Sequence, residues 1–570
     1  MPRVTSAGPS NGERHMNGPQ TTGRDYTNLS APRYGIRRVN NARVPMRDGT
    51  ILLADLWLPD AEGAFPALLA ASPYPRQIQD LGAPAGVIEA GASDFWVPRG
   101  YVHVIANLRG TVGSEGTWSF FDSQERDDLY DIVEWIAEQP WSDGEVGMIG
   151  ISYYAMAQLE AATRNPPHLK AIFPFDVTVE GREAASHNGL FSTAFITPWL
   201  GALGVLSSRS DTFYRTGLAI ARRVLRLPAV HRRFTKTGGE TAAKGLRILN
   251  RLPHPAQPWS QLLADMSERR TRDTWWRDRD VRPLLRNVDI PTYLGSELTN
   301  VPLHLPGVFQ AWDGLKHNPN VRMALLPDHG LPWPWESMHI EALAWFDQWL
   351  KGRQTGILDG PAIRYYLPGA EEWRTSDVWP PTADYREYAL NADGSLAEQE
   401  SAEQESAGSL SYESTSTGLS WSTPPLEGDL DMVGFLELQL TASATADDTA
   451  WIVLLQDVAP DGTATDVTQG WLRASLREVD VAASAPARPE LTLRTASPVP
   501  LGEPVDYRIP LVANSRRFAA GHSIRLTLTS DDTVPGSHAM LGFTHTPVGT
   551  RSTNTVSASS RLLLPVLRET

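Results

Sequence analysis

The stretch that most constrains the fold is residues 141–155, with the sequence WSDGEVGMIGISYYA. Its apolar run at 146–149 predicts a short buried strand, and a helix is expected after the turn, through residues 156–163. A serine on the tight turn between a strand and a helix is raised above the sheet, beside N–H groups that open the helix. The pattern therefore predicts a nucleophile elbow, with Ser152 as the nucleophile and Gly150 as the small residue that the turn requires.

The residues around this elbow alternate between strand and helix patterns. Alternating elements indicate a mostly parallel sheet covered by helices, whose active site lies at the carboxyl ends of the strands. Ser152 falls at such an end. The strands are expected at 39–44, 51–58, 66–71, 101–107, 146–149, 171–175, 291–294 and 321–326, and amphipathic helices at 127–138 and 336–350.

Two further regions have a different character. Strand signals are absent from residues 181–279, where arginine- and leucine-bearing stretches at 218–227 and 242–252 are separated by prolines, so a helical insertion is expected. After residue 352 short alternating runs rich in Thr, Val, Leu and Ser predict a β-sandwich.

Composition excludes several classes of protein. A net charge of −15 argues against binding to nucleic acid or to an anionic membrane, and the absence of cysteine excludes disulfides and thiolate catalysis. No run of about 18 apolar residues is present, and residues 1–30 contain no apolar core of a secretory signal. We therefore expect a cytoplasmic protein with no membrane segment. No metal-binding pattern appears, and no cofactor is implied.

Several blocks, in order along the chain, resemble the cocaine esterase / X-Pro dipeptidyl-peptidase group of serine hydrolases. The elbow of that group reads Gly-X-Ser-Tyr-X-Gly, and here only its last glycine is changed, to Ala155. The other similar blocks are residues 44–50, 54–59, 72–74, 109–116, 345–352 and 520–526.

The resemblance implies an α/β hydrolase fold with an inserted helical cap and a C-terminal all-β jelly-roll domain. Placed on this chain, it predicts the hydrolase domain at 36–178 and 281–354, the cap at 179–280 and the jelly roll at 355–570. Residues 1–35 are expected to be a disordered leader, because the first 30 residues are rich in Gly, Pro, Asn, Ser and Arg.

A serine hydroxyl needs a neighbouring base, and in sheet hydrolases the order along the chain is serine, acid, histidine. His329 directly follows the expected strand at 321–326 and precedes the 345–352 block, where the resemblance places the base. His304 and His317 are weaker candidates because they lie upstream in less defined segments.

The acid departs from the family pattern. The resemblance expects an Asp a few residues after the strand at 290–295, but the matching position is Thr299 or Asn300. Glu297 is the nearest carboxylate and the candidate acid, with Asn300 as the alternative. An Asn can hold an imidazole but supplies no charge, and in a serine-protease triad the Asp-to-Asn change lowers kcat about 10⁴-fold.

For the oxyanion hole, the resemblance implies the Tyr74 hydroxyl together with the backbone N–H of Tyr153. Trp199 and Trp333 are candidates for an aromatic substrate pocket, although such tryptophans equally often pack domains together.

These observations predict a serine hydrolase that cleaves a carboxylic ester of a small molecule through an acyl-enzyme. One alternative is a peptide or amide hydrolase of the X-Pro dipeptidyl-peptidase or amino-acid ester hydrolase type. Another is a weakly active or acyl-transferring relative that lacks the usual Asp. A β-sandwich can seal a cleft or pair two subunits, so a homodimer stays open.

Overall fold

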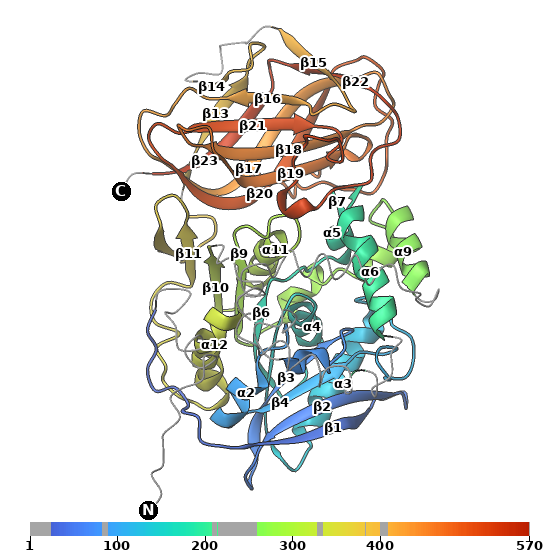
Figure 1. The fold of residues 1–570 in the computed structure, drawn as a ribbon, viewed down its shortest axis with the longest axis vertical. Helices are drawn as coiled ribbons and strands as arrows, with labels where there is room; N and C mark the ends of the chain where they lie inside the picture. Colours follow the sequence, from blue (N-terminus) through green and yellow to red (C-terminus); the bar gives the residue numbers. More distant parts are fainter. Residues whose placement is uncertain are drawn as a thin grey trace, which may run out of the picture.

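The computed structural model describes residues 24–81, 89–207, 214, 259–327, 335–381, 383–399 and 408–568. It consists of an α/β body and an all-β body stacked along the long axis of the molecule (Figure 1). No helix among these residues is both long and apolar enough to cross a membrane.

The α/β body is built on one sheet, with ten strands in the described part of the chain. Pairings from β4 to β11 are parallel, and the outer pairs are antiparallel. In spatial order the strands are β1 (Ile36–Pro45), β2 (Ile51–Pro59), β4 (Val102–Asn107), β3 (Phe65–Ser72), β5 (Ser142–Ile151), β6 (Leu169–Phe175), β9 (Thr292–Glu297), β10 (Val321–Leu326), β11 (Ile363–Leu367) and β12 (Glu372–Ser376).

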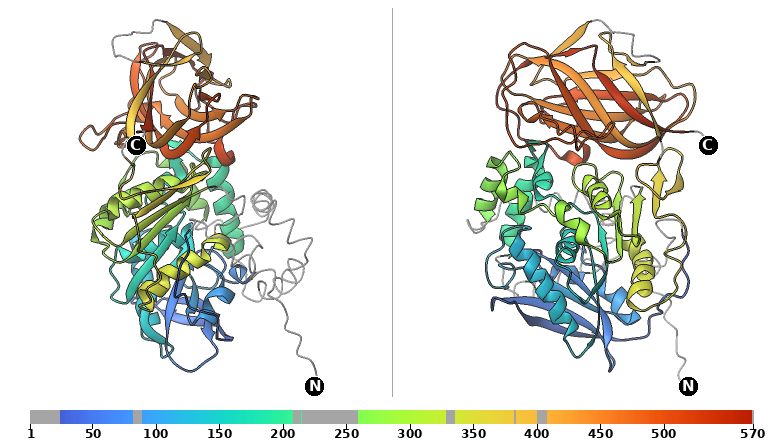
Figure 2. Two further views of the ribbon diagram at one scale, coloured as in Figure 1. Left: turned by 90° about the vertical axis from the view of Figure 1, so that its left-hand side faces the viewer. Right: turned by 180° about the vertical axis from the view of Figure 1, so that it is seen from behind.

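Helices cover both faces of this sheet, which is why its central strands are continuous apolar runs. On one face lie α3 (Ser123–Ala137), α4 (Tyr153–Ala162) and α11 (Leu305–Leu315), which share one hydrophobic core. On the other face, α2 (Ser93–Trp96) and α12 (Trp335–Leu350) enclose a second core (Figure 2). The sheet is thus buried on both sides, as its alternating strand and helix pattern predicts.

The first and last of the expected domain boundaries, at residues 35/36 and 354/355, differ from those in the structure. Residues 24–35 are described as part of the fold, because the buried carboxylate of Asp347 accepts hydrogen bonds from the N–H and the hydroxyl of Ser30, at 2.5 and 2.7 Å. The first sheet also continues past residue 354, since β11 pairs with β10 and β12 pairs with β11. By sheet membership, the all-β body begins after Ser376.

Between β6 and β9 the described residues form several helices and one β-hairpin. The sequence pattern did not predict the hairpin. The expected helices at 218–227 and 242–252 lie outside the described residues. The described elements are α5 (Gly181–Ala185), β7 (Ser186–His187), β8 (Leu190–Phe191), α6 (Thr193–Ser207), α9 (Trp259–Glu268) and α10 (Thr274–Arg277). Short 3-10 turns occur at Ile78–Leu81, Val97–Arg99, Arg282–Asn287, Ala474–Leu476 and Met540–Gly542.

The C-terminal body is rich in β-structure, and its strand pairs are antiparallel. Buried and less buried residues alternate along strands such as β21, the period of two expected of a sheet with one face in a core. The strands are β13 (Ala383–Leu390), β14 (Leu396–Glu398), β15 (Ser409–Glu413), β16 (Leu419–Ser422), β17 (Leu430–Ala444), β18 (Ala450–Val458), β19 (Ala464–Arg473), β20 (Val505–Phe518), β21 (Ser523–Thr529), β22 (Thr553–Ser557) and β23 (Arg561–Leu567).

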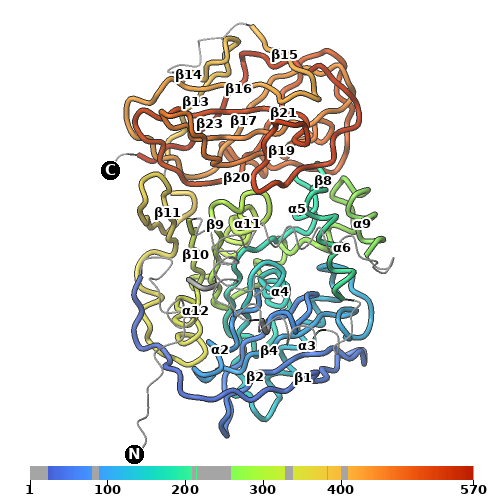
Figure 3. The backbone as a smooth tube through the Cα atoms, in the orientation of Figure 1, coloured from blue at the N-terminus to red at the C-terminus, as the bar shows by residue number. Residues whose placement is uncertain are grey.

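The hairpin β7–β8 joins the two bodies and lies directly against β19 (Figure 3). The Arg473 N–H donates to the Asn188 carbonyl at 3.0 Å, and the Thr546 N–H donates to the Phe191 carbonyl at 2.9 Å. Backbone hydrogen bonds of this kind fix the register of the hairpin against the C-terminal body.

Candidate active site

Ser152 lies on the strained turn that its sequence context predicts. It directly follows β5, precedes α4 and has φ 59° and ψ −120°, a conformation that is unfavourable for a residue with a side chain. Two residues earlier, Gly150 has φ 142°, and a Cβ built on it would lie 2.1 Å from Cβ of Tyr154. Only glycine fits there, so the sharp elbow depends on Gly150.

Neighbouring strands hold the elbow in place. The Ser152 N–H donates to the Phe175 carbonyl at the end of β6, at 3.1 Å. Gln158 of α4 donates through Nε2 to the Gly150 carbonyl at 3.1 Å and accepts through Oε1 from the Phe173 N–H at 2.8 Å. The strained serine is therefore supported by β5, β6 and the helix that follows it.

The imidazole that contacts Ser152 belongs to His304, at the N-cap of α11. Its Nε2 lies 3.1 Å from Ser152 Oγ, and its Nδ1 lies 3.2 Å from Thr178 Oγ1. Thr178 Oγ1 donates its single proton to the Leu303 carbonyl at 3.1 Å, so Nδ1 of His304 must be the donor in the second contact. Nε2 then presents a lone pair to the Ser152 hydroxyl, which is the tautomer that a general base requires.

Burial lowers the pKa of His304 to about 3, so the ring is neutral at ordinary pH. The partner of its Nδ1 is a hydroxyl, where a triad would have a carboxylate. The two acid candidates from the sequence, Glu297 and Asn300, belong to the segment that leads from β9 to His304. Glu297 ends β9, and Asn300 accepts the backbone N–H of His304 at 3.2 Å through its own carbonyl.

The structure adds one carboxylate that the sequence analysis missed. Asp176 directly follows β6, is buried, and accepts a hydrogen bond from Ser296 Oγ at 2.6 Å. Burial raises its pKa to about 6. Its place at the carboxyl end of an apolar strand next to the elbow strand was the signal that could have found it.

Tyr74 lies beside Ser152, as the oxyanion prediction requires. The Tyr74 hydroxyl accepts the Trp199 Nε1–H at 3.0 Å, and it lies close enough to the Ser152 side chain to influence the pKa of Tyr74. Burial and the nearby Glu89 carboxyl hold the pKa of Tyr74 well above its ordinary value. Because Trp199 uses an oxygen lone pair, the phenolic proton can point toward the serine.

The backbone and the side chain of Tyr153 have different roles. It opens α4, so its N–H is in the first helical turn, where amides lack an acceptor within the helix. Its hydroxyl points away into the core, donating to Glu125 at 2.9 Å and accepting from Trp118 Nε1 at 3.0 Å. The side chain thus anchors the helix whose N-terminus faces the serine.

Two predicted site residues, His329 and Trp333, lie outside the described residues. Asp313 forms an ion pair with Arg488 of the C-terminal body. Among the described residues, no group of three His, Asp or Glu side chains could hold a metal ion.

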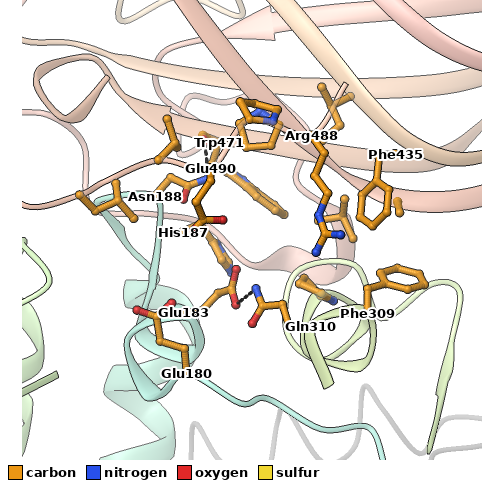
Figure 4. A pocket seen from close by; sticks show the side chains of 18 of the residues that line it. Glu180, Glu183, His187, Asn188, Phe309, Gln310, Phe435, Trp471, Arg488 and Glu490 are labelled. Carbon is orange, nitrogen blue, oxygen red and sulfur yellow. Dashed lines mark hydrogen bonds between the residues drawn. The ribbon is translucent and has the colours of Figure 1, made fainter. Parts of the chain in front are cut away.

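A cavity of about 380 Å³ lies between the α/β body and the C-terminal body (Figure 4). Glu183, His187 and Gln310 line it from the α/β body, and Phe435, Trp471 and Arg488 from the C-terminal body. Pro302 and Leu303 form part of its wall, but the described lining does not include Ser152. The cavity therefore borders the loop that carries His304.

A strained serine at the end of a central parallel strand, with an imidazole at hydrogen-bond distance, defines the class of serine hydrolases with an α/β-hydrolase-like fold. The sequence model of the X-Pro dipeptidyl-peptidase (S15) family matches residues 48–335. The model of the X-Pro dipeptidyl-peptidase C-terminal non-catalytic domain matches residues 355–556. The chain belongs to the X-Pro dipeptidyl-peptidase (S15) family.

Individual relatives agree with this assignment. The chain is 26% identical to the cocaine esterase of Rhodococcus over 552 residues, covering 86% of this chain and 90% of that protein. It is 22% identical to a putative Xaa-Pro dipeptidyl-peptidase of Bacillus cereus over 57% of this chain and 54% of that protein. Among solved structures, a CocE/NonD family hydrolase from Staphylococcus aureus has a TM-score of 0.74 at 23% identity, covering 93% of this chain and 94% of that chain.

Proposed function

We propose that this protein is a serine esterase that hydrolyses a carboxylic ester of a small molecule through an acyl-enzyme. The observation that carries this proposal is the 3.1 Å contact between Ser152 Oγ and His304 Nε2, with the tautomer set by Thr178. His304 is the general base of the proposed reaction, in place of the downstream His329.

In the first half of the reaction, Ser152 Oγ attacks the ester carbonyl carbon while His304 Nε2 takes the hydroxyl proton. The carbonyl oxygen becomes an oxyanion between the Tyr74 hydroxyl and the Tyr153 N–H. A donor of this kind contributes on the order of 3 kcal/mol to transition-state stabilisation. The imidazolium then gives its proton to the departing alcohol oxygen, and the acyl group stays on Ser152.

In the second half, a water molecule loses a proton to His304 Nε2 and attacks the acyl carbon. The tetrahedral intermediate uses the same two oxyanion donors, and His304 returns the proton to Ser152 Oγ as the bond to the acyl group breaks. The net change is one water consumed and one acid and one alcohol released.

The surroundings of His304 favour an ester over an amide. With a hydroxyl on Nδ1 and a buried ring, the imidazolium gains little charge stabilisation, so the base is weak. An alkoxide leaves more readily than an amine and needs less help from the acid form of the histidine. Among individual relatives, the cocaine esterase of Rhodococcus matches 86% of this chain and the putative Xaa-Pro dipeptidyl-peptidase of Bacillus cereus 57%, which supports the same choice. Peptide or amide hydrolysis and acyl transfer are the alternatives.

We also propose that the helices inserted between β6 and β9 form the helical cap of this site, and that the C-terminal strands form a jelly roll. Trp199 of α6 supports the first point, because its indole contacts the Tyr74 hydroxyl directly. The long antiparallel strands β17, β18, β20 and β21 support the second.

The proposal is tested with a short p-nitrophenyl ester and with a fluorophosphonate probe that labels activated serines. Ser152→Ala and His304→Ala should each lower kcat at least about 10³-fold, and labelling should disappear in both. Retained hydrolysis by Ser152→Ala would exclude the mechanism. If His329→Ala abolishes labelling while His304→Ala retains it, the base is His329. Matching rates on X-Pro anilides would favour the peptidase alternative.

A further inference from the structure

A chain of buried polar side chains runs from the C-terminal body to the loop that carries His304. Asp532 Oδ2 lies 2.7 Å from His545 Nδ1, and Asp532 Oδ1 accepts the His545 backbone N–H at 2.9 Å. His545 Nε2 lies 2.7 Å from His187 Nδ1. His187 Nε2 lies 2.6 Å from the carbonyl oxygen of Pro302. All three side chains are buried.

The chemistry of the last acceptor fixes the direction of the whole chain. A carbonyl can only accept, so His187 Nε2 must carry a proton. Burial holds the pKa of His187 well below its ordinary value, so the ring is neutral and its Nδ1 is an acceptor. His545 Nε2 must therefore be a donor, and a further proton must lie between His545 Nδ1 and Asp532.

Three separate parts of the fold meet in this chain. Asp532 and His545 belong to the C-terminal body, His187 to the hairpin strand β7, and Pro302 to the loop between β9 and α11. His187 also stacks on Trp471 of β19, with ring centroids 4.3 Å apart and an interplanar angle of 22°. The orientation of the His187 ring is thus set by the C-terminal body.

The acceptor is next to the proposed base. Pro302 lies two residues before His304, and Pro302 and Leu303 line the cavity of Figure 4. Side-chain packing around this part of the loop is therefore incomplete, and the bond from His187 to the Pro302 carbonyl is a direct restraint on the loop.

We propose that His187, held by His545 and Asp532, is a positioning residue that fixes the Pro302 carbonyl and thereby the 3.1 Å contact between His304 and Ser152. This inference rests on the proposed function, since it gives the C-terminal body a part in setting the catalytic geometry. A displacement of about 1 Å in a catalytic group can lower a rate about 10²-fold.

The arrangement of protons predicts which substitutions preserve the hydrogen bonds that lead from Asp532 to Pro302. In His187→Gln the amide N–H₂ can still donate toward Pro302, whereas His187→Leu cannot. In Asp532→Asn the amide can donate to His545 Nδ1 while its oxygen accepts the backbone N–H, so every link survives without the carboxylate charge. Asp532→Leu removes both hydrogen bonds between residue 532 and His545.

Each variant is assayed on the p-nitrophenyl ester for kcat and KM. His187→Leu and Asp532→Leu should lower kcat about 10- to 100-fold with KM within about twofold, while His187→Gln and Asp532→Asn retain most of kcat. His522→Leu is the matched control, because His522 pairs with Asp457 at 2.7 Å elsewhere in the same body. It should keep the wild-type kcat.

Several outcomes would overturn the inference. Wild-type kcat in folded His187→Leu excludes a positioning role, and a loss in Asp532→Asn equal to that in Asp532→Leu excludes the proton arrangement. If His187→Leu fails to fold, the two Asp532 variants decide. Failure of the proposed function is distinguishable, because Ser152→Ala and His304→Ala would then stay active in the same assay, whatever the chain variants do.

Discussion

The ionisable side chains around Ser152 are all shifted toward their uncharged forms by burial. The pKa of His304 falls to about 3, while those of Asp176 and Glu89 rise to about 6 and about 8. Glu89 lies against the elbow, since its carbonyl accepts the Ile151 N–H at 2.9 Å. Charge that develops on a carbonyl oxygen in such surroundings is poorly screened, so the Tyr74 and Tyr153 donors have a larger effect than in water.

Glu89 should make the folded protein less stable as pH rises. Its pKa is raised by burial and by Asp176, so between an ordinary pKa of about 4.5 and the folded value of about 8 the folded state holds a proton that the unfolded chain has lost. This contribution is present at low pH and is lost as pH rises through 8. Glu89→Gln keeps the neutral form throughout. The melting temperature of the variant relative to the wild type should therefore increase by about 2 °C or more between pH 5 and pH 9.

The control for this experiment is Glu62→Gln at an exposed position, which should leave the difference flat across the same range. A Glu89→Gln variant whose melting temperature follows that of the wild type at every pH would show that Glu89 is ionised in the fold.

Local signals explain which site residues the sequence could supply. Ser152, Gly150 and the Tyr153 amide follow from a continuous strand–turn–helix segment, and Tyr74 from a strand end held by flanking prolines. The base was harder to predict, because His304 and His329 both follow expected strands in the sequence and the choice depends on how the 300–304 loop folds back to Ser152. Asp176 and Thr178 contribute only through contacts between strands, which no single segment displays.

At the scale of elements, strand β5 contains two glycines with positive φ, Gly144 near its start and Gly150 just before the turn into helix α4. The φ angles are 142° at Gly150 and 88° at Gly144. A Cβ on Gly150 would lie 2.1 Å from Tyr154 Cβ, whereas one on Gly144 would have only His168 Cδ2 at 3.7 Å. Alanine at Gly144 would therefore introduce backbone strain alone, whereas alanine at Gly150 would add a steric collision to the same strain.

Gly150→Ala should displace Ser152 and eliminate fluorophosphonate labelling, or prevent folding. The position of Tyr154 Cβ is fixed by the backbone of α4, so no rotation of the Tyr154 side chain can relieve the collision. Gly144→Ala should keep labelling and lower stability by only about 1 kcal/mol, the effect of strain alone. The measurements are labelling stoichiometry and thermal melting. Full labelling in Gly150→Ala would contradict the tight elbow.

Element prediction was most successful where hydrophobic periodicity was strong. The strands β2 to β6, β9 and β10 and the helices α3 and α12 were expected close to their observed bounds. The hairpin β7–β8 was missed because two-residue strands have no period to detect. The first sheet was expected to end before β11. A short strand that follows a helix can belong to either body, and only its pairing with β10 shows that β11 belongs to the first sheet.

For the molecule as a whole, the two bodies share buried surface and cannot be treated as separate units. Residues Ile452, Trp471 and Met540 of the C-terminal body belong to the same hydrophobic cluster as the core around α3, α4 and α11. Backbone hydrogen bonds of the β7–β8 hairpin cross the same junction. An interface with a continuous apolar core couples the unfolding of its two sides.

We therefore expect one cooperative calorimetric transition for both bodies. Trp471→Ala removes a buried indole that stacks on His187, which should lower the free energy of unfolding by about 3–5 kcal/mol. For a chain of this size the shift in melting temperature is about 3 °C, and it should move the whole transition. Trp471→Phe, which keeps an aromatic ring against His187, should have a smaller effect. Two resolved transitions, of which only one responds to Trp471→Ala, would show that the bodies unfold independently and that the junction does not couple them.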